Sequence, residues 1–170
     1  GFIAAYRQRW INRKPGRVLI IGTGGVGRAI TFALAELSAE EVLLHDLDVE
    51  KSTSLKRDLA THSDVKSTLF NLAGASNLDG IDGIVNGTPL GMKPGDPLPF
   101  DPSRLSPGTF VGEVVMKQEI TPLLQAAKDR GCRYQVGTDM LFEMIPAYLE
   151  FFGFGTATPD ELRIVARVSY

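Results

Sequence analysis

The sequence predicts an α/β fold in which helices cover both faces of one doubly wound, mostly parallel sheet. Two observations carry this prediction. Short apolar runs rich in β-branched residues alternate with segments of helical periodicity, and the first run ends in a glycine-rich turn. The 170 residues contain no internal repeat or low-complexity segment, so we expect a single domain over residues 1–170.

The expected elements take their limits from apolar periodicity and from glycine and proline. Phe2, Tyr6 and Trp10 share one face of a first helix, which Pro15 ends, and Gly131 suits the end of a later helix. In chain order we expect a helix over 1–12, strand–helix units over 17–37 and 42–62, a strand over 67–70, a weak helix over 73–78, a strand over 81–85, an irregular proline-rich loop over 89–107, a strand over 110–115, a helix over 122–130, a strand over 132–136, and helices over 140–152 and 159–168. The first and the last two helices are expected to pack on or beside the sheet.

The turn after the first strand carries the pattern Gly22-x-Gly24-x-x-Gly27. Between a strand and a helix this pattern is typical of Rossmann-like dinucleotide-binding folds. Gly22 allows the tight turn, Gly24 lets a diphosphate approach the backbone, and Gly27 lets the helix lie close to the strand. Free N–H groups at the helix start attract the diphosphate. The expected cofactor-binding residues of this turn are Gly22, Thr23, Gly24, Gly25, Val26 and Gly27. The alternative is a tight turn that binds nothing.

The second strand ends at an acidic residue, Asp46, about 20 residues after the glycines. A carboxylate at this place can accept hydrogen bonds from both ribose hydroxyls of the adenosine half of NAD. The 2′-phosphate of NADP would face Asp46 and Asp48, and the nearest cation, Lys51, lies on the next helix. Repulsion therefore favours NAD over NADP. Alternatively, either aspartate caps the helix that starts near Val49; we assign the cap to Asp48 and the ribose to Asp46.

Composition and spacing exclude several classes of function. The net charge is −2 and no basic block occurs, so we expect no nucleic-acid partner. The apolar stretches have strand length, which predicts no membrane span. The single cysteine, Cys132, fits a core position in a reducing, cytoplasmic compartment, and no signal peptide is visible. No metal-ligand spacing occurs, so we expect no metal, and His45 and His62 lack a neighbouring acid or nucleophile that would indicate a catalytic base.

Three motifs, in order, resemble the shikimate and quinate dehydrogenase family. They are Asn-Gly-Thr-Pro-Leu-Gly-Met at 86–92, Thr-Pro-Leu-Leu at 121–124 and Gly-x-x-Met-Leu at 137–141. The resemblance spans nearly the whole chain and implies only the C-terminal NAD(P)-binding domain of a two-domain oxidoreductase. In that family an N-terminal domain binds the substrate and supplies a Lys–Asp catalytic pair. This chain carries neither member, so we expect it to hold no catalytic residue and to be inactive alone.

The resemblance also implies the substrate and the site residues. The substrate is a small cyclic hydroxy acid of the shikimate or quinate type, used in aromatic amino acid biosynthesis or quinate metabolism; monomer and homodimer stay open. Asn86 and Thr88 shape the cleft wall, and the backbones of Val114 and Gly137 line its nicotinamide end. Alternatively, Val114 is only a core strand residue and Gly137 only a turn. The run Asp46-Leu47-Asp48 resembles NAD-using members, because NADP-using members have Asn-Arg-Thr there.

Two positions depart from the family on the substrate side. Met116 stands where the family has a tyrosine and Met144 where it has a glutamine, and both family residues contact substrate hydroxyls. Thioethers remove this polar recognition, which predicts weaker binding of a polyhydroxy acid or a preference for a less hydroxylated analogue. The alternative is that Glu143 or Lys117 takes over the contacts.

Two other functions stay open. The first is a non-catalytic module that senses a nucleotide or metabolite, motivated by Met116 and Met144. The second is another NAD(P) enzyme with a similar domain, such as a methylene-tetrahydrofolate dehydrogenase or a glutamyl-tRNA reductase. The motif at 86–92 argues against the second.

Overall fold

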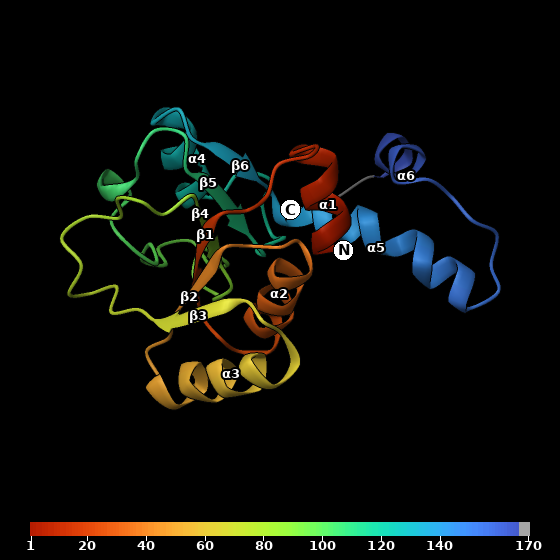
Figure 1. Cartoon of the computed structure of the whole chain (residues 1–170). Helices are drawn as coiled ribbons and strands as arrows, with labels where there is room; N and C mark the ends of the chain where they lie inside the picture. The colour runs from red at the N-terminus through yellow and green to blue at the C-terminus, as the bar shows by residue number, and fades with distance from the viewer. Residues whose placement is uncertain (167–170) are drawn as a thin grey trace.

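The computed structural model describes residues 1–166 and contains six strands and six α-helices there (Figure 1). The strands are β1 (Arg17–Ile21), β2 (Glu41–His45), β3 (Lys66–Leu69), β4 (Gly83–Asn86), β5 (Phe110–Glu113) and β6 (Arg133–Gln135). The helices are α1 (Phe2–Arg9), α2 (Gly25–Glu36), α3 (Val49–His62), α4 (Pro122–Asp129), α5 (Gly137–Phe151) and α6 (Pro159–Val165), with a short 3₁₀ helix η1 (Pro102–Arg104).

The strands form one sheet in the order β3-β2-β1-β4-β5-β6, and every neighbouring pair is parallel. The predicted doubly wound α/β class is confirmed, with a sheet that is parallel throughout rather than mostly parallel. Strand order reverses between β1 and β4, where Ile21 pairs with Asn86. The carboxyl ends of all strands therefore meet at one edge, and ligands of such sheets bind at the reversal point of that edge.

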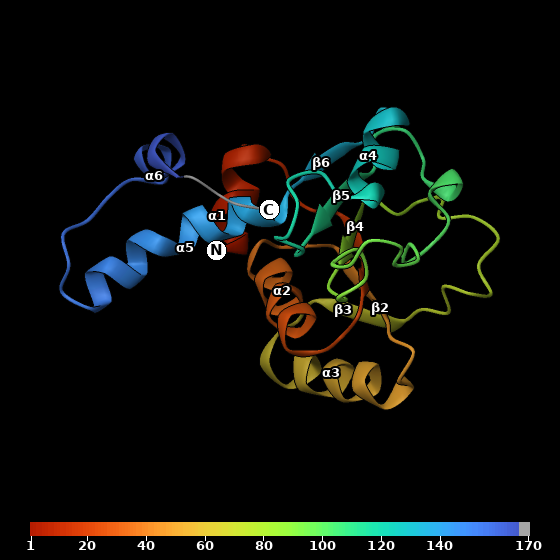
Figure 2. The same ribbon diagram turned by 180° about the vertical axis from the view of Figure 1, so that it is seen from behind.

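Each face of the sheet buries its own apolar cluster. On one face α1, α2 and α3 pack on side chains such as Ile20 and Phe110. On the other face α4 and the irregular stretch between β3 and β5 cover side chains such as Leu19 and Ile84. Figure 2 shows this stretch, in yellow to green, away from α2 and α3. Cys132 is buried in the second cluster, as predicted for a core position.

The weak helix predicted over 73–78 does not form, so that prediction is wrong. The side chains of Asn71 and Asn77 accept hydrogen bonds from the N–H groups of Gly74 and Asp79, each at 3.1 Å. Such local turns compete with helix formation. Leu78 still packs in the core, so an irregular segment covers the sheet where a helix was predicted.

Several element limits differ from the predicted ones by a few residues. α1 ends at Arg9, and Asn12 has a φ of 59°, outside the helical region. α5 begins at Gly137 instead of residue 140, and β5 ends at Glu113 instead of residue 115. α6 is described to Val165, and the predicted helical residues 167–168 lie outside the described residues.

The amino ends of three strands meet at Glu41, which is 4% exposed. Its carboxylate accepts hydrogen bonds from Arg17 Nε at 2.8 Å and Thr68 Oγ1 at 2.7 Å, and Lys66 Nζ lies at 3.0 Å. Burial opposes ionisation, yet these contacts lower the pKa of Glu41 from 4.5 to about 2. These hydrogen bonds and ion pairs link β1, β2 and β3 at the end of the sheet opposite the candidate site.

The terminal helices lie beside the sheet. Tyr6 of α1 and Trp10, the C-cap residue of that helix, pack on Phe110, with ring centroids 5.5 and 5.0 Å from that of Phe110. α5 starts at the sheet edge and extends away from it, and α6 folds back along α5 (Figure 1). Within residues 1–166, no helix combines the length and apolar character that crossing a bilayer requires.

Candidate functional site

The glycine-rich turn brings β1, α2 and the segment after β4 into close contact. Gly22 has a φ of 88°, the left-handed region that favours glycine. A Cβ on Gly27 would lie 1.8 Å from the Gly22 carbonyl oxygen, and one on Gly87 would lie 2.9 Å from the same atom. The close helix–strand approach predicted for Gly27 is therefore present, and Gly87 adds a third glycine to the contact.

The amino end of α2 faces open space. Gly24 is its N-cap and makes no side-chain capping hydrogen bond. A Cβ on Gly24 or Gly25 would meet no atom within 4 Å. The first turn of α2 thus borders a free volume and brings to it its unpaired N–H groups and the positive end of the helix dipole, an arrangement that suits an anion.

Two cavities meet at this turn. The larger, of about 790 Å³, extends from Val26 toward Val114 and the start of the chain. The smaller, of about 460 Å³, extends from Gly22 toward Asp46 and Leu47. Four residues border both cavities, namely Gly24, Gly87, Thr88 and Pro89. The fold therefore forms two adjoining compartments with the α2 amino end between them.

Asp46 is held in the smaller cavity by three hydrogen bonds. Its Oδ2 accepts from Thr23 N at 2.7 Å and Thr23 Oγ1 at 3.0 Å, and its Oδ1 accepts from Asp48 N at 2.9 Å. Partial burial opposes ionisation, but these hydrogen bonds outweigh it and hold the pKa of Asp46 below its usual value. A fixed carboxylate anion with accepting capacity left on Oδ1 thus lies beside the glycine turn.

The residues next to Asp46 divide into a cap and an exposed side chain. Asp48 is the N-cap of α3 and accepts from Glu50 N at 3.2 Å, which confirms the predicted cap. Lys51 Nζ lies 3.7 Å from Asp48 Oδ2, so the nearest cation faces that carboxylate. Leu47 is 95% exposed and borders the smaller cavity.

Asn86 and Thr88 play different parts. Thr88 borders both cavities, whereas Asn86 is fully buried and lines neither. Asn86 Oδ1 accepts from Thr88 N at 3.0 Å and Thr88 Oγ1 at 2.6 Å, and Asn86 Nδ2 donates to the Leu90 carbonyl at 3.1 Å. Asn86 thus shapes the wall from behind it.

Val114 and Gly137 also have different places relative to the larger cavity, because only Val114 lines it. Gly137 is buried as the first residue of α5, and a Cβ there would lie 2.3 Å from the Val115 carbonyl oxygen. Gly137 therefore lets α5 start against the segment that follows β5. The alternative prediction for Gly137 is a simple turn, and the structure has the first residue of a helix there.

Comparison with known proteins gives a consistent family. No family model matches the chain. The chain is 34% identical over 164 residues to a shikimate dehydrogenase (NADP(+)) of Acidiphilium cryptum, covering 95% of this chain and 57% of that protein. It is 31% identical over 157 residues to a quinate/shikimate dehydrogenase (NAD(+)) of Corynebacterium glutamicum, covering 90% and 55%. The chain is a homologue of the shikimate and quinate dehydrogenases.

Solved structures agree with this homology. The quinate dehydrogenase from Corynebacterium glutamicum in complex with NAD has a TM-score of 0.83 at 31% identity, with 96% of this chain and 59% of that chain covered. A ligand-free 5-ketofructose reductase of Gluconobacter sp. strain CHM43 has a TM-score of 0.82 at 25% identity, with 94% and 58% covered. The predicted family is confirmed. This chain spans little more than half the length of these relatives, which is consistent with the NAD(P)-binding domain alone.

The two positions predicted to lie on the substrate side, Met116 and Met144, are part of an apolar wall. The four methionines of the chain all line the larger cavity, namely Met92, Met116, Met140 and Met144. Four unbranched, polarizable side chains give a wall that adapts its shape but donates no hydrogen bond. The sequence predicts two of them at this place, and the fold adds Met92 and Met140.

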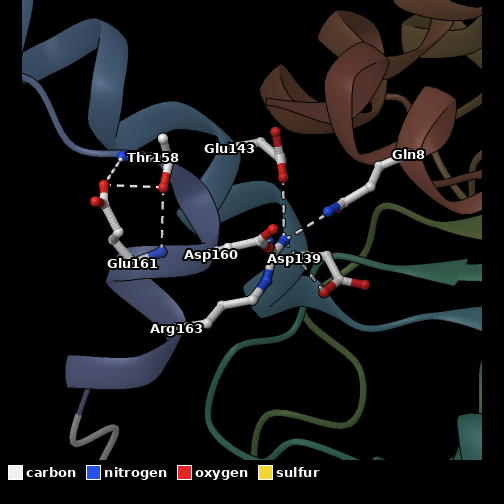
Figure 3. Close-up of polar contacts among 7 residues, drawn as sticks. All are labelled: Gln8, Asp139, Glu143, Thr158, Asp160, Glu161 and Arg163. Atoms are coloured by element: carbon white, nitrogen blue, oxygen red, sulfur yellow. Dashed lines mark hydrogen bonds and ion pairs between the residues drawn. The ribbon is translucent and has the colours of Figure 1, made fainter.

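Glu143 and Lys117 do not supply polar groups to this wall. Glu143 Oε1 accepts a hydrogen bond from Arg163 Nη2 at 3.1 Å, in a cluster that also contains Gln8 and Asp139 (Figure 3). Lys117 lines a third cavity, of about 660 Å³, beside the segment 90–99. Neither side chain lines the larger cavity, so its methionine wall keeps its apolar character.

Both histidines are hydrogen-bonded to backbone carbonyls, and the His62 ring also packs edge-on against Phe32. His45 Nδ1 lies 3.1 Å from the Phe70 carbonyl, and His62 Nδ1 lies 2.8 Å from the Asp58 carbonyl. Among residues 1–166, no three acidic, histidine or cysteine side chains are grouped as metal ligands.

Proposed function

We propose that this chain is the NAD(P)-binding domain of a shikimate dehydrogenase-like oxidoreductase. The observation that carries the proposal is the meeting of two cavities at the amino end of α2, with the anion Asp46 in one and Val114 in the other. A dinucleotide fits this arrangement, because its two nucleoside halves can occupy the two cavities while the diphosphate that joins them lies at the amino end of α2.

The residues assigned to this cofactor have distinct tasks. The N–H groups at Gly24, Gly25 and Val26 bind the diphosphate, and Asp46 accepts the adenosine ribose hydroxyls beside Leu47. Thr88 and Val114 border the nicotinamide half. Gly22 borders the smaller cavity, and the residues that shape these surfaces from behind are Thr23, Gly27, Asp48, Asn86 and Gly137. When bound, the nicotinamide supplies hydride transfer, and this chain binds and orients it.

NAD is the proposed cofactor in preference to NADP. Asp46 is fixed as an anion at the ribose position, and a 2′-phosphate there would meet this charge at short range. Lys51 also lines the smaller cavity, but its ammonium lies 3.7 Å from the Asp48 carboxylate, which offsets part of its charge. Relatives named for NAD and for NADP both occur, so the preference rests on these side chains.

The substrate proposed for the whole protein is a small cyclic hydroxy or keto acid. Relatives carry shikimate and quinate in their names, and the methionine wall favours an analogue with fewer hydroxyls on the side facing Met116 and Met144. Proton transfer requires a Lys–Asp pair from a substrate domain, so this domain alone is proposed to be inactive.

The test is an assay of the full-length protein that contains this chain. Reduction of 3-dehydroshikimate with NADH, or oxidation of shikimate or quinate with NAD, is the expected result. Absence of turnover with either cofactor overturns the oxidoreductase. A parallel titration with NAD then distinguishes the second candidate function, a sensing module, which is favoured by the loss of polar side chains at Met116 and Met144 and binds without turnover.

A further inference from the structure

A buried carboxylate with no ionic partner lies behind the cofactor cleft. Glu113 ends β5 and is 2% exposed. Within residues 1–166, no lysine or arginine forms an ion pair with it. Burial raises the pKa of Glu113, and hydrogen bonds from Thr121 and Asn86 oppose the rise. Burial of an unpaired carboxyl costs stability, so its presence calls for a role other than packing.

One oxygen of Glu113 holds the turn after β4. Oε1 accepts from Asn86 Nδ2 at 2.6 Å. With the bonds to Thr88 and Leu90 described above, this contact uses every donor and acceptor of the Asn86 side chain. The Asn86 amide nitrogen faces two acceptors and its oxygen faces two donors, so a flipped amide would lose all four hydrogen bonds. Glu113 therefore helps to fix the orientation of Asn86.

This turn presses directly on the glycine-rich turn. A Cβ on Gly22 would lie 2.6 Å from Thr88 Cγ2, and one on Gly87 would lie 3.0 Å from Gly27 Cα. Thr88 also borders both cavities. A rotation of Asn86 therefore displaces the wall at the point where the two compartments join.

The other oxygen of Glu113 points away from the cleft. Oε2 accepts a hydrogen bond from Thr121 Oγ1, and that hydroxyl accepts from Leu124 N as the N-cap of α4. Thr121 lines neither compartment. The chain therefore offers a matched control, since one arm of the same carboxylate reaches the cleft wall and the other reaches a helix cap.

We propose that Glu113 is a positioning residue of the cofactor cleft, which acts through Asn86 to hold Thr88 at the junction of the two compartments. The inference rests on the proposed binding of a dinucleotide. The proposed role predicts different effects on the binding of two ligands, NAD and AMP. NAD must cross the junction, whereas AMP occupies only the smaller cavity, which shares Thr88 with the junction but holds Asp46 through Thr23 and Asp48 without help from Glu113.

The test is a charge-exchange cycle with NAD and AMP titrated calorimetrically into the full chain. Asn86→Asp removes the amide donors to Glu113 Oε1 and to the Leu90 carbonyl, and we expect NAD to bind at least about tenfold more weakly while AMP loses a clearly smaller factor, about threefold or less. Adding Glu113→Gln restores a donor–acceptor pair, because the introduced amide can donate to the introduced carboxylate while its oxygen accepts from Thr121. The Leu90 carbonyl still lacks its donor, so the double variant is expected to recover at least about threefold of the lost NAD affinity without reaching that of the unmodified chain.

Thr121→Val is the control for general damage. It removes the other hydrogen bond to Glu113 and a helix cap, so it lowers the unfolding temperature while NAD affinity changes by less than about twofold. Should Asn86→Asp fail to fold, Glu113→Ala compared with Thr121→Val at matched stability loss gives the same contrast between NAD and AMP. Parallel losses of NAD and AMP, or a double variant no better than Asn86→Asp, overturn the positioning role. An unmodified chain that binds neither probe overturns the proposed function itself.

Discussion

The most informative single substitution is Asp46→Asn, because it changes charge at nearly constant shape. The amide oxygen can keep the two hydrogen bonds from Thr23, at 2.7 and 3.0 Å. The amide nitrogen then faces the Asp48 N–H, which lies 2.9 Å from the native oxygen, so two donors oppose each other. One hydrogen bond is lost, and we expect unfolding stability to fall by about 1–2 kcal/mol.

The effect on cofactor preference is larger. Loss of a charge-assisted hydrogen bond to the ribose is worth roughly 1.5–3 kcal/mol, a weakening of NAD binding of about 10- to 100-fold. NADP gains from removal of a repulsion that amounts to about 1–4 kcal/mol per charge pair at 4 Å, according to solvent exposure. The two effects shift the ratio of the NADP and NAD dissociation constants in the same direction, by more than about tenfold.

The assay is calorimetric titration of NAD and NADP, with Asp48→Asn as the matched control. Asn replaces Asp as an N-cap at little cost, so the control removes a neighbouring charge and keeps the Glu50 contact. We expect it to change the ratio by less than about threefold. A ratio in Asp46→Asn equal to that of the unmodified chain would show that Asp46 does not face the ribose.

Three further predictions concern packing, pH and the terminal helix. Gly27→Ala places a Cβ 1.8 Å from a backbone oxygen and is expected to cost more than about 2 kcal/mol in urea unfolding, whereas Gly25→Ala, with open space at its Cβ, leaves stability unchanged and weakens only NAD binding. Glu41 has its pKa lowered to about 2, so its contribution is complete above pH 4.5 and is lost as the pH falls toward 2. Glu41→Gln is expected to remove roughly 2 kcal/mol at pH 7 and to flatten the acid limb of the stability curve; an unchanged limb would contradict the assignment. Arg163→Ala removes the contacts to Glu143 and Asp160 in Figure 3, and limited proteolysis should then cut near α6 faster; equal cleavage rates would show that apolar contacts alone hold it.

The sequence indicates the fold and the cofactor turn because both depend on local patterns. The run before Gly22 is a buried strand, and the glycine spacing has meaning only between a strand and a helix. Asp48 was predictable as a cap for the same reason, since capping involves residues two or three positions apart. The error at 73–78 is also local. The Asn71 and Asn77 side chains compete with helical hydrogen bonds, and apolar spacing does not report that competition.

The rest of the site depends on contacts between distant segments. Glu113 meets Asn86 across 27 positions, and its acidic side chain alone resembles any exposed residue at a strand end. Gly137 is predicted to line the nicotinamide end and Gly87 has no predicted role, and only the fold shows a carbonyl oxygen within 3 Å of the place where either Cβ would lie. Met92 and Met140 likewise join the larger cavity only through the topology of the sheet.

The central claim is that one dinucleotide spans both compartments with its diphosphate at the amino end of α2. The most direct measurement follows backbone amide resonances while NAD is titrated into the chain. The account predicts saturable shifts at Gly24, Gly25 and Val26, together with residues in both compartments, Asp46 and Val114 among them. Shifts confined to the third cavity beside segment 90–99, or none that saturate, would contradict it.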